Sequence, residues 1–164
     1  MDRAHHVGMA DIIVVSAPEV LVTLGLGSCI GLVLYDQSAK VAGMAHIMLP
    51  DSRGAGAKAL EKPGKFADTA IPKLIDMVCA KGALRTRLKA KYAGGSQMFA
   101  LPGAQTDFLA VGSRNAKETE LLLKRTGISI VKFDVGGNKG RTIEFSTTTW
   151  MLTVKVLGKG KIEI

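Results

Sequence analysis

The chain has 164 residues, with 22 Lys and Arg against 14 Asp and Glu, giving a formal net charge of +8. This length is typical of one domain, so we expect a single domain over residues 1–164. Hydrophobic residues make up 47% of the chain and charged residues 22%, which excludes a disordered protein. The two cysteines, Cys29 and Cys79, are too few for a disulfide framework, and with three histidines they cannot build a Cys-rich zinc site. We expect no metal and no other cofactor.

The positive charge favours an acidic partner such as nucleic acid, a membrane surface or an acidic protein. Nucleic acid is not expected, because aromatic residues are only 5% of the chain and the basic residues are scattered along it. Membrane insertion is not expected either. The longest uncharged run, Val20 to Tyr35, is shorter than the ~20 apolar residues of a spanning helix, and the N-terminus is a poor signal peptide. We therefore expect a soluble cytoplasmic protein with both thiols free.

The first third of the chain predicts strands. Four segments qualify by their β-branched residues: Ile12–Ser16, Val20–Leu24, Ile30–Tyr35 and Val41–Met48. The last two flank the polar turn Asp36–Lys40, so we expect them to form a hairpin. The apolar period is lost from Asp51 to Gly64, where glycines and charged residues predict a loop.

A helix should follow this loop. Apolar residues recur at helical spacing from Ala67 to Val78, and Gly82 ends the pattern. Pro72 fits this helix if Asp68 or Thr69 is the N-cap, because proline is tolerated in the first turn.

A second helix is predicted to begin near Asn115, which forms a capping-box pattern with Glu118, and to end at Gly127. Further strands are expected at Leu88–Ala93, Ile128–Phe133, Thr142–Phe145 and Met151–Val156, with a turn at Gly136–Gly140. The alternation of basic and other residues from Arg85 to Lys91 predicts the solvated face of a strand. Many strands with two helices and no repeats indicate an α+β fold rather than a βαβ series.

The segment from Thr23 to Gly31 carries the clearest chemical signal. Cys29 lies between two apolar segments, with Gly27 and Gly31 two residues away on either side. A nucleophile on a tight turn needs small neighbours, so that substrate can approach it closely. A strand is predicted to follow, which excludes the strand-to-helix elbow of α/β-hydrolases. The alternative is that Cys29 is a small buried hydrophobic residue.

His46 is the candidate base. In the predicted hairpin, Cys29 lies opposite the neighbourhood of His46 and Ile47, but a shift of one residue would turn His46 to the other face. Thr23 on the preceding strand could join the pair, and Asp51 is the alternative partner for His46. A nearby imidazole can lower a thiol pKa from its ordinary value of about 8.5. The alternative is that His46 is an ordinary core or surface histidine.

Six ordered blocks resemble one family. They are Leu24–Cys29, Ala45–Pro50, Lys65–Ile71, Gly94–Phe99, Gly112–Asn115 and Asp134–Arg141. At this spacing the chain resembles the CheD family of bacterial chemoreceptor glutamine deamidases, over about residues 11 to 145. Phe66 and Ser96 stand where family members often have Tyr and Ala.

The resemblance implies a specific activity. The family hydrolyses side-chain amides of selected glutamines on methyl-accepting chemotaxis receptors, which leaves glutamate and ammonia. Its catalytic cysteine, histidine and threonine correspond to Cys29, His46 and Thr23. The implied fold is an α+β sandwich of sheets flanked by helices, similar to glutamine-deamidating bacterial toxins. The implied partners are the receptor cytoplasmic domain and the CheC family of response-regulator phosphatases.

Other residues are assigned roles on weaker sequence signals. Backbone N–H groups around Gly27, Ser28 and Cys29 are candidate oxyanion donors, and Phe99 is a candidate anchor for a protein partner. Cys79 is expected to be a core residue, and His5 and His6 are expected in a tail. Two other functions stay open: a binding module that regulates the phosphatase or the receptor, and a different cysteine amidase or protease.

Overall fold

The computed structural model describes residues 2–98 and 110–164. The strands in these ranges are β1 (Ala4–His6), β2 (Ile12–Ser16), β3 (Val20–Leu26), β4 (Ile30–Asp36), β5 (Val41–Ile47), β6 (Lys89–Gly94), β7 (Ser129–Val135), β8 (Arg141–Ser146), β9 (Leu152–Val156) and β10 (Gly160–Glu163). The α-helices are α1 (Lys58–Glu61), α2 (Ala67–Ala80) and α3 (Val111–Arg125), and short 3-10 helices cover Pro63–Lys65 and Arg85–Arg87. No helix in the described ranges is long and apolar enough to cross a membrane.

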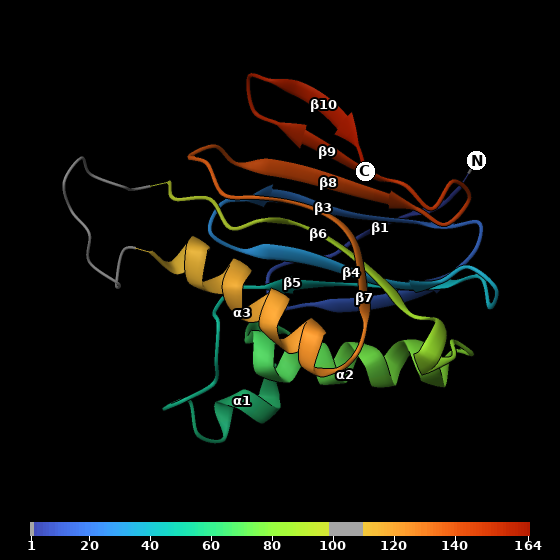
Figure 1. Cartoon of the computed structure of the whole chain (residues 1–164), viewed down its shortest axis with the longest axis horizontal. Helices are drawn as coiled ribbons and strands as arrows, with labels where there is room; N and C mark the ends of the chain where they lie inside the picture. The colour runs from blue at the N-terminus through green and yellow to red at the C-terminus, as the bar shows by residue number, and fades with distance from the viewer. Residues whose placement is uncertain (1, 99–109) are drawn as a thin grey trace.

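The elements form three layers (Figure 1). One sheet has the strand order β1-β3-β8-β9-β10, and the second has the order β2-β5-β4-β6-β7. The two sheets pack face to face, and α2 and α3 cover the other face of the second sheet. This arrangement confirms the predicted α+β class with sheets flanked by helices.

Each interface between layers has its own apolar core. The core between the sheets includes Leu21, Leu26, Met44, Ile143 and Phe145, all fully buried. The core between the second sheet and the helices is formed by alternate residues of β4 and β5 with the apolar face of α2. The middle sheet is therefore buried on both faces, which explains why every residue of β4 and β5 is buried and why both strands are mostly apolar rather than alternating.

The predicted hairpin is confirmed. β4 and β5 pair antiparallel, with Ile30 opposite Ile47 and Gly31 opposite His46, a shift of one residue from the predicted register. Gly31 faces the first sheet at close range. A Cβ atom there would lie 2.4 Å from Cδ1 of Ile143 and 3.3 Å from Cγ2 of Thr23.

Two strands at the ends of the chain were not predicted. His5 and His6 belong to β1, not to a tail, and β1 pairs parallel with β3, with His5 opposite Leu21. Near the C-terminus, β10 pairs with β9. Both are short edge strands whose composition is largely polar, so they carry no apolar pattern of their own.

The N-terminus of α2 differs from the prediction. Its N-cap is Phe66, in an extended conformation, and the helix begins at Ala67 rather than after Asp68 or Thr69. Pro72 therefore lies inside the helix, where its ring removes one backbone hydrogen bond. The helix persists because its apolar face, which includes Ile71 and Leu74, is fully buried against the second sheet.

The prediction of a strand through Arg85–Arg87 was wrong. This segment is a 3-10 turn, and β6 begins only at Lys89. The turn is organised by the buried carboxylate of Asp36, which accepts the Leu84 N–H at 2.9 Å and forms an ion pair with Arg87.

The second predicted helix is present, but it begins one turn earlier than expected. Its N-cap is Ala110, and Asn115 is not a cap. Asn115 is fully buried, and its side chain points out of the helix to two backbone carbonyls of other segments. A capping-box pattern therefore marked a residue whose polar group has a tertiary role.

Candidate functional site

A buried chain of hydrogen bonds joins the two sheets near the start of β4. The Thr23 hydroxyl on β3 lies 2.8 Å from Nδ1 of His46 on β5. The same hydroxyl donates to the carbonyl of Val7 at 2.6 Å. Thr23 is 1% exposed and His46 3% exposed, so water does not compete for these groups.

This chain fixes the tautomer of His46. A threonine hydroxyl has one proton, and the carbonyl of Val7 can only accept. Since the hydroxyl proton goes to Val7, the hydroxyl oxygen must accept from His46. The Nδ1 atom of His46 therefore carries the proton, and Nε2 is left with its lone pair free.

The segment Val7–Asp11, between β1 and β2, also holds the backbone of His46. The N–H of Ala10 donates to the His46 carbonyl at 3.0 Å, and the N–H of His46 donates to the Asp11 carbonyl at 3.1 Å. Both the ring and the main chain of His46 are thus held through this one N-terminal segment.

Cys29 lies on the same face of the second sheet as His46. Gly31 is directly opposite His46 in the hairpin, and Cys29 stands one residue before β4. Cys29 packs against the core between the sheets, and the His46 ring bonds to Thr23 on the first sheet, so both side chains face the first sheet. The ladder between β4 and β6 extends to Cys29, whose carbonyl accepts the Gly95 N–H at 2.9 Å. Cys29 is half-buried. The two side chains therefore lie on one face near the open end of the β4–β5 hairpin.

Burial affects both groups in the same sense. It raises the pKa of the Cys29 thiol and lowers the pKa of the His46 imidazole. Each shift disfavours the charged form, so the resting pair is a neutral thiol and a neutral imidazole. This is opposite to the lowered thiol pKa that the sequence led us to expect.

Hydrogen-bond donors from other segments bind all three backbone carbonyls of the Cys29 loop (Gly27–Cys29). Gly27 accepts from the N–H of Ser96 at 2.9 Å and from the Ser96 hydroxyl at 2.8 Å. Ser28 accepts from Nδ2 of Asn115 at 2.8 Å, and Cys29 accepts from Gly95. The segments that supply these donors are Gly94–Ser96, after β6, and the first turns of α3.

Glycines allow these segments to approach so closely. A Cβ atom on Gly94 would lie 2.1 Å from the carbonyl oxygen of Cys29, and one on Gly112 would lie 2.3 Å from that of Ser96. Gly94 also has φ near +121°, which disfavours any other residue.

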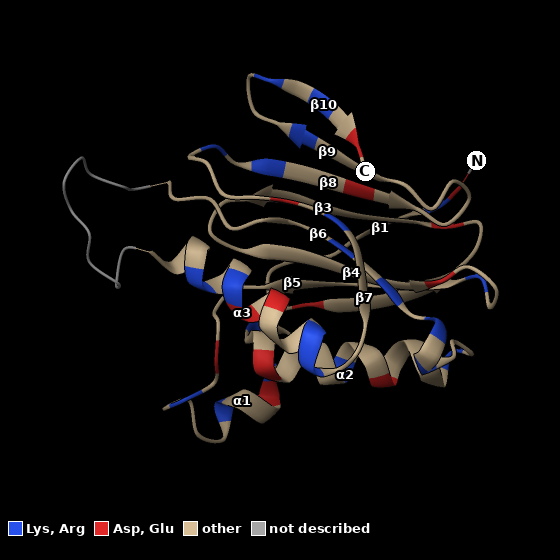
Figure 2. Ribbon diagram, in the orientation of Figure 1, with Lys and Arg blue, Asp and Glu red and all other residues tan. Residues whose placement is uncertain are grey.

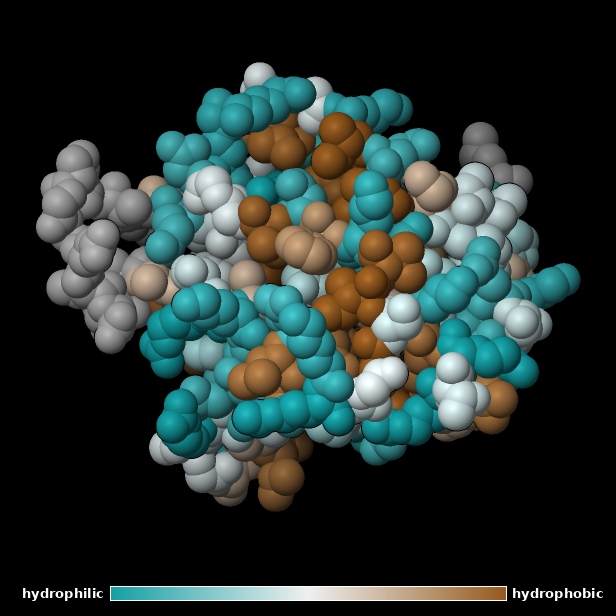
Figure 3. All heavy atoms as spheres, in the orientation of Figure 1, coloured by the Kyte–Doolittle hydropathy of each residue, from teal (hydrophilic) through white to brown (hydrophobic). Residues whose placement is uncertain are grey.

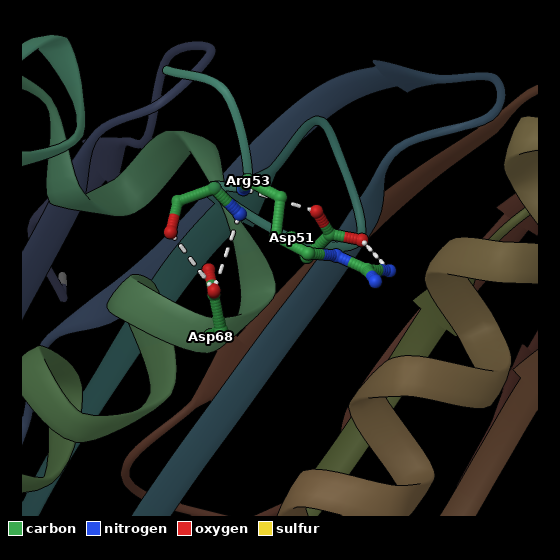
Figure 4. Close-up of polar contacts among 4 residues, drawn as sticks. Asp51, Arg53 and Asp68 are labelled. Atoms are coloured by element: carbon green, nitrogen blue, oxygen red, sulfur yellow. Dashed lines mark hydrogen bonds and ion pairs between the residues drawn. The ribbon is translucent and has the colours of Figure 1, made fainter. Parts of the chain in front are cut away.

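Asp51, the alternative partner for His46, is engaged elsewhere (Figure 4). Its carboxylate accepts from the backbone N–H and the guanidinium of Arg53, at 3.1 and 3.0 Å. The next residue, Ser52, donates its N–H and hydroxyl to Asp68 at the start of α2. These contacts fold the loop after β5 onto α2, and Asp51 does not orient the imidazole.

Two surface depressions are lined by residues close in sequence to the site. One, of about 610 Å³, is lined by Gly25, Arg141, Lys155 and Lys161 among others, and one of about 620 Å³ is lined by Leu49 and Phe66 with the loop after β5. Figure 2 shows basic residues on β8, β9 and β10, and of these Arg141, Lys155 and Lys161 line the first depression. Neither Cys29 nor His46 lines either of them.

The face seen in Figure 3 carries a band of exposed apolar side chains over the strands of both sheets. Among the exposed apolar residues are Val131 and Phe133 on β7 and Ile162 on β10. Phe99, the predicted partner anchor, lies outside the described residues. Within the described ranges, no group of three or more His, Cys, Asp and Glu residues could hold a metal ion.

Comparison with known proteins identifies the family. The model of the family described as CheD chemotactic sensory transduction matches residues 48–156. A Halalkalibacterium halodurans protein named chemoreceptor glutamine deamidase CheD is 48% identical over 164 residues, covering 100% of both chains. The chain belongs to the CheD family. Two further CheD relatives, each named probable chemoreceptor glutamine deamidase, come from Desulfitobacterium hafniense (46% identical, 98% of both chains) and Geobacillus kaustophilus (44%, 99% of this chain and 98% of the relative).

Solved structures with some likeness to this CheD chain are more distant. A Neisseria meningitidis protein of the DUF152 family is 13% identical with a TM-score of 0.47, covering 82% of this chain and 63% of that one. The hypothetical protein YfiH of Bacillus licheniformis is 14% identical with a TM-score of 0.46, covering 80% and 59%.

Three residues near the site were not singled out for these contacts from the sequence. Val7 lies in a segment with no motif, and its carbonyl gives no sequence signal at all. Ser96 and Asn115 lie within two of the CheD-like blocks, Gly94–Phe99 and Gly112–Asn115. The family-like blocks therefore marked the two segments as important, but they did not indicate that Ser96 and Asn115 bind the carbonyls of the Cys29 loop.

Proposed function

We propose that this CheD protein hydrolyses the side-chain amide of selected glutamines on chemoreceptors, with Cys29 as the nucleophile, His46 as the general base and acid, and Thr23 as the group that orients His46. The observation that carries the proposal is the hydrogen-bond chain from His46 through Thr23 to Val7, on the face of the sheet where Cys29 lies. Full-length relatives named chemoreceptor glutamine deamidase support the same activity.

The first half of the reaction forms a thioester. As the sulfur of Cys29 attacks the glutamine carboxamide carbon, its proton passes to Nε2 of His46, and the carbonyl electron pair moves to oxygen. The resulting tetrahedral oxyanion needs backbone donors, for which the N–H groups of the Cys29 loop at Ser28 and Cys29 are the candidates. Its collapse breaks the C–N bond, and the His46 proton leaves with the nitrogen as ammonia.

The second half releases glutamate. Water attacks the thioester carbon while Nε2 of His46 takes one of its protons. The C–S bond then breaks, and the proton returns to the sulfur. The charged imidazolium that forms twice in this cycle faces a neutral hydroxyl rather than a carboxylate, so it is stabilised less than in a Ser-His-Asp site. We therefore expect a slow enzyme.

The surroundings of the site fit a protein substrate. Neither large depression is lined by Cys29 or His46, and the basic residues on β8–β10 favour an acidic surface on the partner. The substrate is then the cytoplasmic domain of a methyl-accepting chemotaxis receptor, which places the enzyme in the cytoplasm. A CheC-type phosphatase is the second proposed partner.

Peptide mass spectrometry tests this function. A chemoreceptor cytoplasmic fragment is incubated with the intact protein or with Cys29→Ala, and glutamine-to-glutamate conversion is mapped. Conversion by the intact protein alone is the expected result. No conversion, with Cys29 inert to iodoacetamide between pH 7 and 10, would favour the binding module. No conversion with a reactive Cys29 would favour another amidase or protease.

A further inference from the structure

Asn115 on α3 connects the segment that carries Cys29 to the segment that carries His46. Its Nδ2 donates to the carbonyl of Ser28 at 2.8 Å and to the carbonyl of Met48 at 3.0 Å. Ser28 precedes Cys29, and Met48 follows His46 by two residues. One fully buried amide on α3 therefore bridges the Cys29 loop and the end of the strand that carries His46.

The orientation of this amide is unambiguous. Both partners are backbone carbonyls, which only accept, so the group that faces them must be the NH₂ and not the oxygen. Asn115 thus uses both of its donor hydrogens on the site. Its Oδ1 is buried and has no partner among the described residues, so no competing bond in that part of the chain holds the side chain in place.

The bond to Ser28 sets the direction of the next N–H. In a trans peptide the carbonyl oxygen and the following N–H point to opposite sides. Holding the Ser28 carbonyl toward α3 therefore turns the Cys29 N–H away from α3. Ser96 holds the Gly27 carbonyl by two bonds and fixes the Ser28 N–H in the same way.

In the part of the chain that the structure describes, these two N–H groups have no protein partner and could donate to a ligand oxygen. Among the described residues, neither the Ser28 N–H nor the Cys29 N–H donates to any carbonyl or side chain. The backbone N–H of a nucleophilic residue is a common oxyanion donor in acyl transfer, because it lies beside the attacking atom. Buried donors held in advance are worth most there, since they need no reorganisation during the reaction.

We propose that Asn115 is a positioning residue that holds the Ser28–Cys29 peptide with its N–H directed at the oxyanion of the glutamine amide. The proposal rests on the proposed function and adds a residue from a distant helix to it. Asn115 touches neither substrate nor thiol. It acts through the peptide that it holds, and its second bond keeps that peptide in register with the strand of His46.

Two reactions of Cys29 separate this role from a merely structural one. Deamidation passes through an oxyanion, whereas alkylation by iodoacetamide is a direct displacement at carbon that forms none. Loss of an aligned oxyanion donor costs roughly 10²–10³ in kcat. For Asn115→Ala and Asn115→Leu we expect at least a tenfold fall in kcat on a receptor fragment. We expect KM, and the rate of Cys29 alkylation at each pH, to stay within about twofold of the values for the intact protein.

Asn115→Leu is the sharper variant, because it nearly keeps the shape of the side chain and removes its donors without burying a charge. The matched control is Thr119→Val, one turn further along α3, fully buried and without a hydrogen-bond partner among the described residues. It should leave both reactions unchanged. Unchanged kcat in both Asn115 variants would overturn the proposal. So would an equal fall in deamidation and alkylation, which would mean that Asn115 only supports the fold. An intact protein that alkylates but deamidates nothing would instead refute the proposed function.

Discussion

Replacing Thr23 with Val tests the link between the two sheets. The variant keeps the shape of the side chain but removes the hydroxyl that joins His46 to Val7. In the transition state His46 becomes a buried imidazolium, and its Nδ1–H then makes a charge-assisted hydrogen bond to the hydroxyl. Such bonds contribute about 1.5–3 kcal/mol. The resting enzyme loses its neutral bond as well, worth about 0.5–1.5 kcal/mol, so only the difference of about 1–1.5 kcal/mol lowers kcat. This difference corresponds to a fall in kcat of roughly 5- to 13-fold.

The fold should weaken at the same time. The Val7 carbonyl and Nδ1 of His46 both lose their partner in a buried place, and each unsatisfied group costs roughly 1–3 kcal/mol. The assay is therefore initial-rate ammonia release from a receptor fragment at 20 °C, with folding checked by circular dichroism. Thr23→Ser keeps the hydroxyl and should retain most of the activity. Activity of Thr23→Val equal to that of the intact protein, or equal loss in the Ser and Val variants, would refute the role of the hydroxyl.

Three more predictions follow from the same geometry. Cys29→Ala should abolish glutamine conversion, as judged by mass spectrometry, while leaving the melting temperature within a few degrees of the intact protein; residual conversion would exclude Cys29 as the nucleophile. Gly31→Ala should destabilise the fold by about 1–3 kcal/mol in urea unfolding, because its Cβ would overlap Ile143 between the sheets; an unchanged midpoint would contradict that packing. Burial lowers the pKa of His46, so as the pH is lowered below about 6.5 the unfolded chain takes up a proton before the folded chain does. The free energy of unfolding therefore decreases as the pH is lowered below about 6.5, and His46 adds no pH dependence above that value. Urea midpoints from pH 5 to 8 should show this slope, and His46→Gln should reduce it; an identical slope in both proteins would contradict the assignment.

Local patterns predicted the centre of the fold well. The β4–β5 hairpin was placed within one residue of its register, because its apolar runs are interrupted by one short polar turn. That register is what made contact between Cys29 and His46 plausible from the sequence. Thr23 was placed on the preceding strand as a possible partner for the pair, and the family resemblance gave it a catalytic role.

The features that were missed depend on partners far away in the sequence. β1 is a strand only because it lies beside β3, and Ala4–His6 has no apolar pattern to show it. Asn115 looked like a cap because Glu118 follows at the right spacing, and only the packed helix shows its amide bonded to Ser28 and Met48. The thiol pKa was expected to fall because sequence spacing says nothing about burial, which raises it.

The wide sequence separation of these contacts has a consequence for how the chain matures. The bonds of Asn115 span 87 and 67 residues, and the hydroxyl bond of Thr23 to Val7 spans 16. Contacts of long range form late, since the chain must close large loops before they stabilise it. On our proposals, a nascent or partly folded chain holds Cys29 without an aligned oxyanion donor. Deamidase activity then appears only when α3 docks, so that incomplete chains are harmless to the receptors around them.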